Sequence, residues 1–583
     1  MKLPGFRKRE ARLQLVVWVY LIFALVIIFK LGILQIKHGA RYRLEAQKSH
    51  FLKDEIPAPR GYIYDRNGQP LAISIPTYSL YAEPRYLALT DTPLEVARKL
   101  APVLEMPVDQ LNAILSSGKG FAWIQRRLPY ETYAKIRDLG LSGKIGFEEH
   151  YERSYPEGRL ACHIIGTTNL DGQGIEGLEK EYDRYLTGRK GNYEVFRDGR
   201  GRRLPWEYSS QPAIPGWNLH LTIDLRLQRI LEEEIDVIQQ KHTPRGIMAI
   251  ILDADTGEVL ALTNRPNYDP NRPAPALEPR RNRAITDINE PGSVFKMVTA
   301  AGLLEEGAVK PADRFFCENG IWRVPGRHKP LGDVHHYGML TFREIIVKSS
   351  NIGTVKAALK MGKERMYHYA STFGFGNKTG IDLPGEVRGI LHPLKNWSGV
   401  SMYAIPYGQE VAATAIQSAA AMAAICNGGT LNHPYVVSRI STREGKTVEK
   451  FQPRAVRRAV SAKTCDTLLP ILSEVTSQEG TARSADIPGY QVGGKTGTGQ
   501  KVEGGRYVDG QYFSSFTGFI NTGQKKFAIF IGVDNPRNGH YGGTVAGPAF
   551  NRIGRRALIT LNIPPDQAEV DTAPFLKKSS GPR

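Results

Sequence analysis

The stretch "EPGSVFKMVTAAGLL" (residues 290–304) places a Ser-x-x-Lys sequence at the start of an apolar helix. Pro291 and Gly292 provide a sharp turn before it, and apolar residues then recur at helical spacing. Ser293 and Lys296 are three residues apart and therefore share one face of the predicted helix. The amine of Lys296 could remove the hydroxyl proton of Ser293 and make its oxygen a nucleophile. The alternative is a serine beside a solvated lysine, and residues 116–119 match the same spacing.

Two short motifs downstream complete a candidate constellation. They are Ser349-Ser350-Asn351 and Lys495-Thr496-Gly497-Thr498. Lys-Thr-Gly also occurs at residues 378–380, within a turn-rich loop, whereas Lys495 follows the strand-like sequence "YQVGG". Only the second copy can present its side chains along a strand beside the nucleophile. We therefore predict that residues 378–380 have a structural role.

The composition of the 583-residue chain is that of a globular protein with two or three domains. The formal net charge of +19 invites a nucleic-acid hypothesis, but no zinc spacing or RNA-binding motif accompanies it. The four cysteines are scattered and show no Cys-x-x-Cys spacing, so the sequence indicates neither a zinc site nor a dense disulfide framework. We expect most of them to be buried, and one disulfide stays open as an alternative.

Residues 13–36 form an apolar run long enough to cross a bilayer as a helix. Residues 1–12 are rich in Lys and Arg, so the positive-inside rule predicts a cytoplasmic head and export of the chain after about residue 37. The run is long for a signal peptide and no clear cleavage site follows it, so we favour an uncleaved anchor over a cleaved signal. The prediction is a single-pass protein of the inner (cytoplasmic) membrane with its catalytic domain on the extracytoplasmic, periplasmic side.

The exported part divides into two predicted modules, which makes the fold class α+β multidomain. Residues 37–235 combine short strands, helical patterns and turns in an irregular α+β module without an obvious catalytic cluster. Residues 236–565 begin with two apolar strands around Asp255-Thr256-Gly257 and end with the strand pair "SSFTGFINT" and "KKFAIFIGVD". Long helical stretches lie between these strands, so we predict an antiparallel sheet flanked by helices. Residues 566–583 are predicted to be a flexible tail.

The three motifs, in this order, resemble the active-site set of penicillin-binding proteins and serine β-lactamases. The first module contains "RGYIYDRNGQPLA" (60–72), "RSYPEG" (153–158) and "GIEGLEKEYD" (174–183), which resemble the N-terminal module of class B penicillin-binding proteins. The resemblance implies a membrane-anchored D,D-transpeptidase that cross-links peptidoglycan stem peptides, releases D-Ala and binds β-lactam antibiotics. It also implies a non-catalytic, dimerisation-type pedestal for residues 37–235 and a serine β-lactamase-like transpeptidase domain for residues 236–565.

This resemblance and the chemistry of the side chains assign the expected roles. Ser293 attacks a carbonyl, and Lys296, with its pKa lowered by burial beside other cationic groups, is the general base. Ser349 relays a proton to the departing amine, and Asn351 orients a substrate amide. The backbone N–H groups of Ser293 and Thr498 form the oxyanion hole, and no metal or other cofactor is needed. Lys495 is a further catalytic residue that supplies positive charge. The residues expected to bind the substrate are Thr496, Gly497 and Thr498, with both threonines hydrogen-bonding its terminal carboxylate.

Within class B, "EPGSVFK" and Ser-Ser-Asn resemble the division-type (FtsI-like) and sporulation branches. The resemblance implies septal wall synthesis with a polytopic SEDS-family glycosyltransferase (FtsW-like) and other division proteins as partners, and no nucleic acid. An elongation-type or sporulation-type transpeptidase and a D,D-carboxypeptidase are the alternatives. A β-lactamase is disfavoured because no Glu-x-x-Leu-Asn lies between Asn351 and Lys495. The intact motifs and the short cytoplasmic head disfavour a non-catalytic scaffold and a penicillin sensor.

Overall fold

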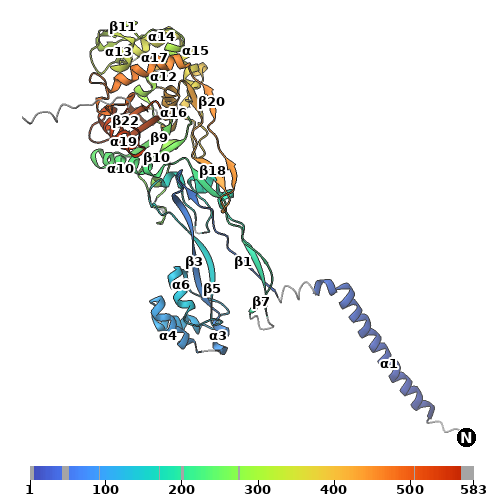
Figure 1. Ribbon diagram of the computed structural model, residues 1–583. Coiled ribbons are helices and arrows are strands. Elements are labelled where there is room, and N and C mark those ends of the chain that lie inside the picture. Colours follow the sequence, from blue (N-terminus) through green and yellow to red (C-terminus); the bar gives the residue numbers. More distant parts are fainter. Residues whose placement is uncertain are drawn as a thin grey trace, which may run out of the picture. The chain divides into compact units, whose positions relative to one another are not determined.

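The computed structural model describes residues 6–42, 51–90, 92–169, 171–197, 203–272, 276–327, 329–503 and 506–565. Residues 1–5 of the predicted basic head and the predicted tail, 566–583, lie outside the described residues. Contacts between residues divide the chain into two units (Figure 1). The first comprises Met1–Ala58, Thr77–His150 and Gly188–Pro215, and the second comprises Pro59–Pro76, Tyr151–Thr187 and Gly216–Arg583.

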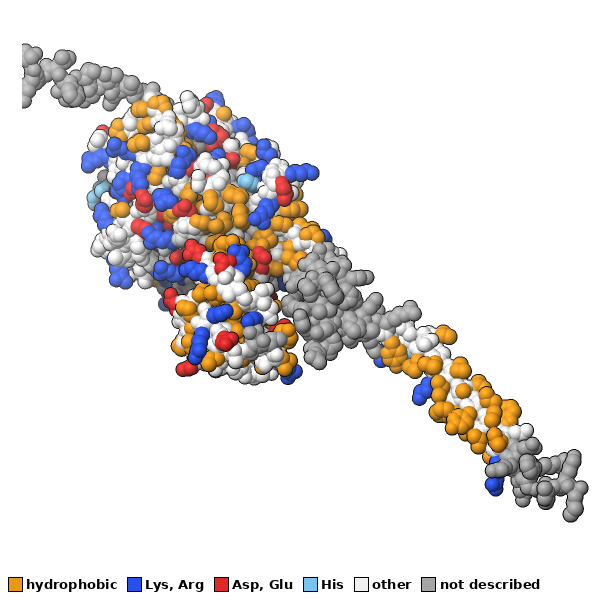
Figure 2. Space-filling view, turned by 60° about the horizontal axis from the view of Figure 1, so that its bottom comes forward, with side chains coloured by type: hydrophobic (Ala, Val, Ile, Leu, Met, Phe, Trp, Pro, Cys, Tyr) orange, Lys and Arg blue, Asp and Glu red, His pale blue; other side chains and the backbone are white. Residues whose placement is uncertain are grey.

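The first unit begins with helix α1 (Phe6–Gly32), which continues into a short π-helical turn, η1 (Ile33–Lys37). The stretch Ala11–Lys37 has a mean hydropathy of 2.6, and its most apolar part is not buried in the protein. Hydrophobic side chains cover the surface of this helix (Figure 2). A helix of 27 residues is about 40 Å long, which exceeds the thickness of a bilayer's hydrocarbon core. The helix is therefore a candidate membrane span, at the place that the sequence predicts.

The remainder of the first unit contains a three-stranded antiparallel sheet and a helical lobe. The strands of the sheet follow the order β1 (Phe51–Ile56), β6 (Gly191–Arg197), β7 (Arg203–Gln211). In the lobe, helices pack around a small core with parts of β3 (Pro70–Ala82), β4 (Ala122–Leu128) and β5 (Ile145–Ser154). The helices of the lobe are α3 (Pro84–Thr90), α4 (Pro93–Leu104), α5 (Val108–Leu115) and α6 (Tyr130–Arg137).

A five-stranded antiparallel sheet forms the centre of the second unit, in the order β10-β9-β23-β22-β21. The side chains of β9 (Gly246–Asp253) alternate between two hydrophobic cores: Ile247 and Ile251 belong to one, and Met248 and Ile250 belong to the other. Because successive side chains of a strand point to opposite faces, the sheet is covered on both sides. The other four strands are β10 (Val259–Arg265), β21 (Gln491–Glu503), β22 (Arg506–Asn521) and β23 (Lys526–Asp534).

Helices supply both covers of this sheet (Figure 1). One face packs against α10 (Leu225–His242) and α19 (Gly547–Thr560), and the other against α16 (Ala415–Cys426). This architecture confirms the predicted α+β fold with an antiparallel sheet flanked by helices. The further helices of eight or more residues are α12 (Lys296–Glu305), α14 (Asn351–Met361), α15 (Lys363–Thr372) and α17 (Ala462–Ser473). Shorter elements include β2 (Ile63–Tyr64), α8 (Gly177–Glu181), β8 (Asn218–Leu221), α13 (Phe342–Val347), β18 (Val437–Ser441) and α18 (Gly542–Val545).

Segments of the predicted pedestal are packed into this second unit. Arg60 and Arg153 share the buried carboxylate of Glu179, with nitrogen–oxygen distances of 2.5 and 2.6 Å. The hydroxyl of Tyr182 donates to Asp382 over 3.1 Å. Strand β2 pairs in parallel with β8, which in turn pairs with β18. All four cysteines are buried and free, as expected for small apolar side chains.

Candidate active site

Ser293 lies in a 3-10 turn, η3 (Gly292–Phe295), directly before α12. Gly292 has a φ of +54°, a backbone conformation that favours glycine, and its N–H donates to the Gly408 carbonyl over 3.1 Å. The α-helix therefore begins at Lys296, and its first predicted turn is replaced by the tighter 3-10 turn. Ser293 stands at the N-terminal end of the helix, where the helix dipole favours developing negative charge.

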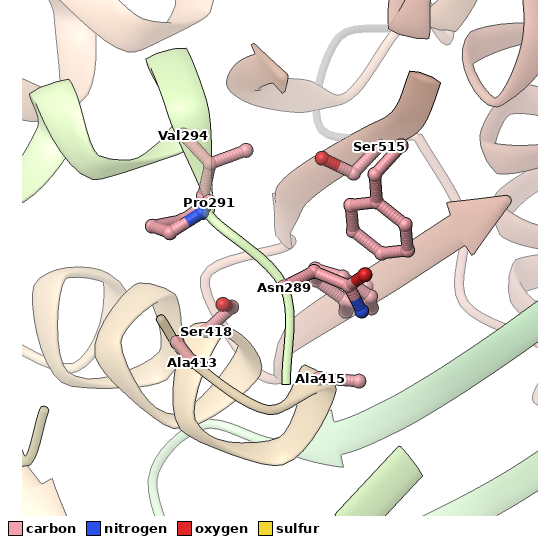
Figure 3. A pocket seen from close by; sticks show the side chains of 9 residues that line it. Asn289, Pro291, Val294, Ala413, Ala415, Ser418 and Ser515 are labelled. Atoms are coloured by element: carbon pink, nitrogen blue, oxygen red, sulfur yellow. The ribbon is translucent and has the colours of Figure 1, made fainter. Parts of the chain in front are cut away.

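The turn that carries Ser293 is closely packed from behind. Figure 3 shows the side chains of Pro291 and Val294 on one side of a small cavity and that of Ser515 on the other, with Asn289 between them. The cavity has a volume of about 10 Å³. That volume holds one water molecule at most, so the residues that line the cavity leave little free space beside the turn.

Ser349 and Asn351 come from a break between two helices. The sequence predicts one helical stretch over residues 339–361, but the structure divides it into α13 and α14. Ser349 lies at the break with a φ of +62°, and the Ser350 hydroxyl caps α14 by accepting the N–H of Gly353 over 2.9 Å. The difference arises because serine and asparagine favour helix N-caps over helix interiors.

The amine of Lys296 is the centre of the polar contacts. Its Nζ donates to the Ser349 carbonyl oxygen over 2.6 Å, to the Ser349 Oγ over 3.2 Å and to the Asn351 Oδ1 over 2.8 Å. Ser293 is half-buried, and its side chain makes no hydrogen bond with any residue that the structure describes. The structure thus brings Lys296 together with the second motif, and Lys296 forms no hydrogen bond with Ser293.

Lys495 also contacts the Ser349 hydroxyl, from strand β21. It lies on β21, at the edge of the five-stranded sheet, and its Nζ donates to the Ser349 Oγ over 2.9 Å. Two residues of the same strand hold neighbouring segments: the Thr496 hydroxyl lies 3.2 Å from that of Thr481, and the Thr498 Oγ1 accepts the N–H of Gly542 over 3.2 Å. The three predicted motifs therefore converge on one site in the second unit.

Gly497 explains how closely β21 approaches the turn of Ser293. A Cβ atom at this position would lie 2.4 Å from the Ser515 Oγ and 2.9 Å from the Pro291 carbonyl oxygen. Neither distance is compatible with a side chain, and Pro291 is fixed by its own packing. The glycine of the Lys-Thr-Gly sequence is therefore required for the contact between this strand and the turn that carries Ser293.

Both lysines of the site are fully buried, and burial disfavours their charged forms. Burial lowers the pKa of Lys495 from 10.5 to about 7. The pKa of Lys296 is also well below its usual value, first because of burial and second because of the positive charge of Lys495, while Asp333 opposes the shift. A lower pKa increases the fraction of free amine at a given pH, and a free amine can accept a proton.

Asp333 holds the second motif in place, and the sequence does not reveal this contact. Its carboxylate accepts the Ser350 hydroxyl and the Asn351 N–H, each over 2.5 Å, and the Ile352 N–H over 3.0 Å. It therefore neutralises the positive end of α14 and fixes the backbone of the second motif. Asp333 stands in a loop without helical or strand periodicity, so no local signal marks it.

The other Lys-Thr-Gly sequence, at residues 378–380, lies in a loop and forms hydrogen bonds with Glu386. The Thr379 N–H and hydroxyl donate to Glu386 over 2.7 and 2.6 Å, and the Gly380 N–H donates to the same carboxylate over 3.0 Å. These contacts hold the loop together, which agrees with the structural role predicted for it.

Two family models match the chain. Residues 247–555 match the penicillin binding protein transpeptidase domain, and residues 55–221 match the penicillin-binding protein dimerisation domain. This chain belongs to the class B penicillin-binding proteins. As a penicillin-binding protein with a transpeptidase domain, it is an enzyme of the transpeptidase class.

Known class B penicillin-binding proteins resemble this one over most of its length. Stage V sporulation protein D of Bacillus subtilis is 34% identical over 580 residues, covering 98% of this chain and 89% of the relative. Peptidoglycan D,D-transpeptidase FtsI of Escherichia coli is 33% identical over 524 residues, covering 88% of this chain and 85% of the relative. The crystal structure of penicillin binding protein 3 of Mycobacterium tuberculosis, complexed with aztreonam, superposes with a TM-score of 0.67 at 27% identity, covering 88% of this chain and 98% of that one.

Proposed function

We propose that this penicillin-binding protein cross-links peptidoglycan stem peptides through an acyl-enzyme on Ser293. The observation that carries the proposal is the convergence of two buried lysines on one serine hydroxyl beside the nucleophile turn. The Ser349 Oγ lies 3.2 Å from the Lys296 Nζ and 2.9 Å from the Lys495 Nζ. Such an arrangement can move a proton between an amine and a hydroxyl without a metal ion.

In the first half-reaction, the Ser293 oxygen attacks the carbonyl of the penultimate D-Ala and its proton passes to the free amine of Lys296. The backbone N–H groups of Ser293 and Thr498 stabilise the oxyanion. The bond to the terminal D-Ala then breaks, and Ser349 relays the proton from Lys296 to the departing amine. In the second half-reaction an acceptor amine attacks the ester, its proton returns through Lys296, and Ser293 regains its hydroxyl.

Substrate orientation is assigned to the remaining motif residues. Lys495, Thr496, Gly497 and Thr498 lie on the edge strand β21, where a peptide can align beside the strand and place its terminal carboxylate near the lysine and threonine side chains. Asn351 orients a substrate amide. Its Oδ1 accepts from Lys296 over 2.8 Å, and its Nδ2 donates to the Gly332 carbonyl over 2.9 Å.

The same proposal includes a role in septal wall synthesis. The similarity to FtsI supports it, and we place the protein in the cytoplasmic membrane through α1, with the catalytic unit on the periplasmic side. A SEDS-family glycosyltransferase and other division proteins are the proposed partners. A role in sporulation is the second candidate, because the similarity to stage V sporulation protein D extends over 98% of the chain.

Intact-mass spectrometry of the full-length protein with benzylpenicillin tests the mechanism. A stable adduct that peptide mapping places on Ser293, and that is absent from S293A, is the expected result. An adduct on another residue would contradict the proposed nucleophile. Rapid turnover of the antibiotic by folded protein would indicate a hydrolase instead of a transpeptidase. Depletion of the protein distinguishes the roles: filamentation at blocked septa is expected for division, and normal growth with defective spores for sporulation.

A further inference from the structure

Four hydrogen bonds join the segment before Ser293 to the loop at residues 408–413. Asn289 and Ala413 exchange two backbone bonds, of 3.0 and 2.9 Å, and the Gly292 N–H donates to Gly408 over 3.1 Å. In the fourth bond, the Glu410 N–H donates over 3.0 Å to the Oε1 of Glu290, two residues before Gly292. The position of the nucleophile turn therefore depends partly on a side-chain carboxylate.

The same carboxylate also binds the hairpin of β21 and β22. The Tyr507 hydroxyl lies 3.3 Å from the Glu290 Oε1 and 3.2 Å from its Oε2. Tyr507 pairs with Val502, four residues beyond Thr498 on the strand that carries the third motif. Glu290 thus connects the far end of this hairpin to the turn that carries Ser293.

The geometry of Glu410 indicates that this connection is built at a cost in backbone strain. Glu410 has a φ of +58°, in the left-handed region that side chains other than glycine rarely occupy. In that conformation its N–H points at Glu290, while its own carboxylate accepts the Ser401 hydroxyl over 2.6 Å. Strained residues that persist at a site are held there by their surroundings, here by hydrogen bonds at both ends of Glu410.

We propose that Glu290 and Tyr507 are positioning residues that hold Ser293 and the strand carrying Lys495 at the spacing that acylation requires. The inference rests on the proposed role of Ser293 as the nucleophile. Neither residue takes part in proton transfer. Their loss leaves the binding of the antibiotic intact and slows the bond-forming step, because a displaced nucleophile lowers the population of reactive geometries.

Stopped-flow acylation of the full-length, detergent-solubilised protein by a fluorescent penicillin tests the proposal, since it separates the dissociation constant from the acylation rate constant. We expect Y507F to lower the acylation rate constant about fivefold, and E290A about 30-fold, with the dissociation constant changed less than twofold. In E290Q the amide oxygen can still accept hydrogen bonds from the Glu410 N–H and the Tyr507 hydroxyl. Its acylation rate constant should therefore stay within about threefold of that of wild type. Y512F on β22, the strand of Tyr507, and E364Q at an exposed position of α15 are the matched controls and should behave as wild type.

Unchanged acylation in Y507F and E290A would overturn the proposal, as would a loss in E290Q equal to that in E290A. A weaker dissociation constant with an unchanged rate constant would also overturn it and would make the two residues part of a ligand subsite. If E290A shows no cooperative thermal transition, Y507F decides the question by itself. Labelling of S293A would instead refute the proposed nucleophile, so the two failures are distinguishable.

Discussion

Replacing Lys495 by methionine should make the protein more stable at neutral pH while it abolishes acylation. Lys495 is fully buried, and its pKa is lowered from 10.5 to about 7 by that burial. The difference between the two pKa values corresponds to about 5 kcal/mol at 1.36 kcal/mol per pH unit. At pH 7 it destabilises the folded state by about 4 kcal/mol. Methionine fills a similar volume without a charge, so the variant avoids this penalty. It also loses the hydrogen bond to Ser349, which destabilises the variant by about 1 kcal/mol.

The expected net gain is therefore about 3 kcal/mol at pH 7, measured as a rise in the thermal midpoint of K495M over wild type in detergent. The sign follows from linkage: the pKa is lower in the folded state, so the wild type gains stability as pH rises from about 7 toward 10.5. The advantage of K495M should accordingly fall below about 1 kcal/mol at pH 10. An advantage that is equal at both pH values, or a K495M protein less stable than wild type at pH 7, would refute the reasoning.

Three further predictions concern the same unit. The acylation rate should rise with pH as Lys296 loses its proton, with a midpoint well below 10.5, and a rate limb that begins only near 10.5 would contradict the lowered pKa. D333A should lower the acylation rate constant about tenfold or more, because Ser350 and Asn351 lose a charged partner, and unchanged kinetics in stopped-flow labelling would contradict this role. E179Q should destabilise the second unit by about 3 kcal/mol in thermal unfolding, because two buried arginines lose their shared counter-charge, and a change below 0.5 kcal/mol would contradict the importance of this ion pair.

The sequence predicted the elements of the catalytic unit where local patterns are strong. The strands on both sides of Asp255-Thr256-Gly257 lie where turn residues and apolar runs place them. The break at Ser349 was missed, since the apolar pattern continues across it and only the capping preference of Ser350 marks the boundary.

The candidate site shows the same division between local and long-range information. The three motifs could be found because each is short and contiguous. Asp333, Glu290 and Tyr507 could not be assigned, because each acts through a partner between 17 and 217 residues away along the chain. The contact between Lys296 and Ser349 likewise depends on how two helices meet, which spacing along one helix does not reveal.

The packing of Arg60, Arg153 and Tyr182 into the second unit also determines where this enzyme can be cut for study. A fragment that starts at residue 236 retains all three motifs but removes β8, and thereby leaves the edge of β18 without its partner strand. It also removes the tyrosine that hydrogen-bonds to Asp382. Open strand edges promote association between molecules, so such a fragment should aggregate during purification. A soluble version for crystallisation or inhibitor screening should therefore start no later than residue 59.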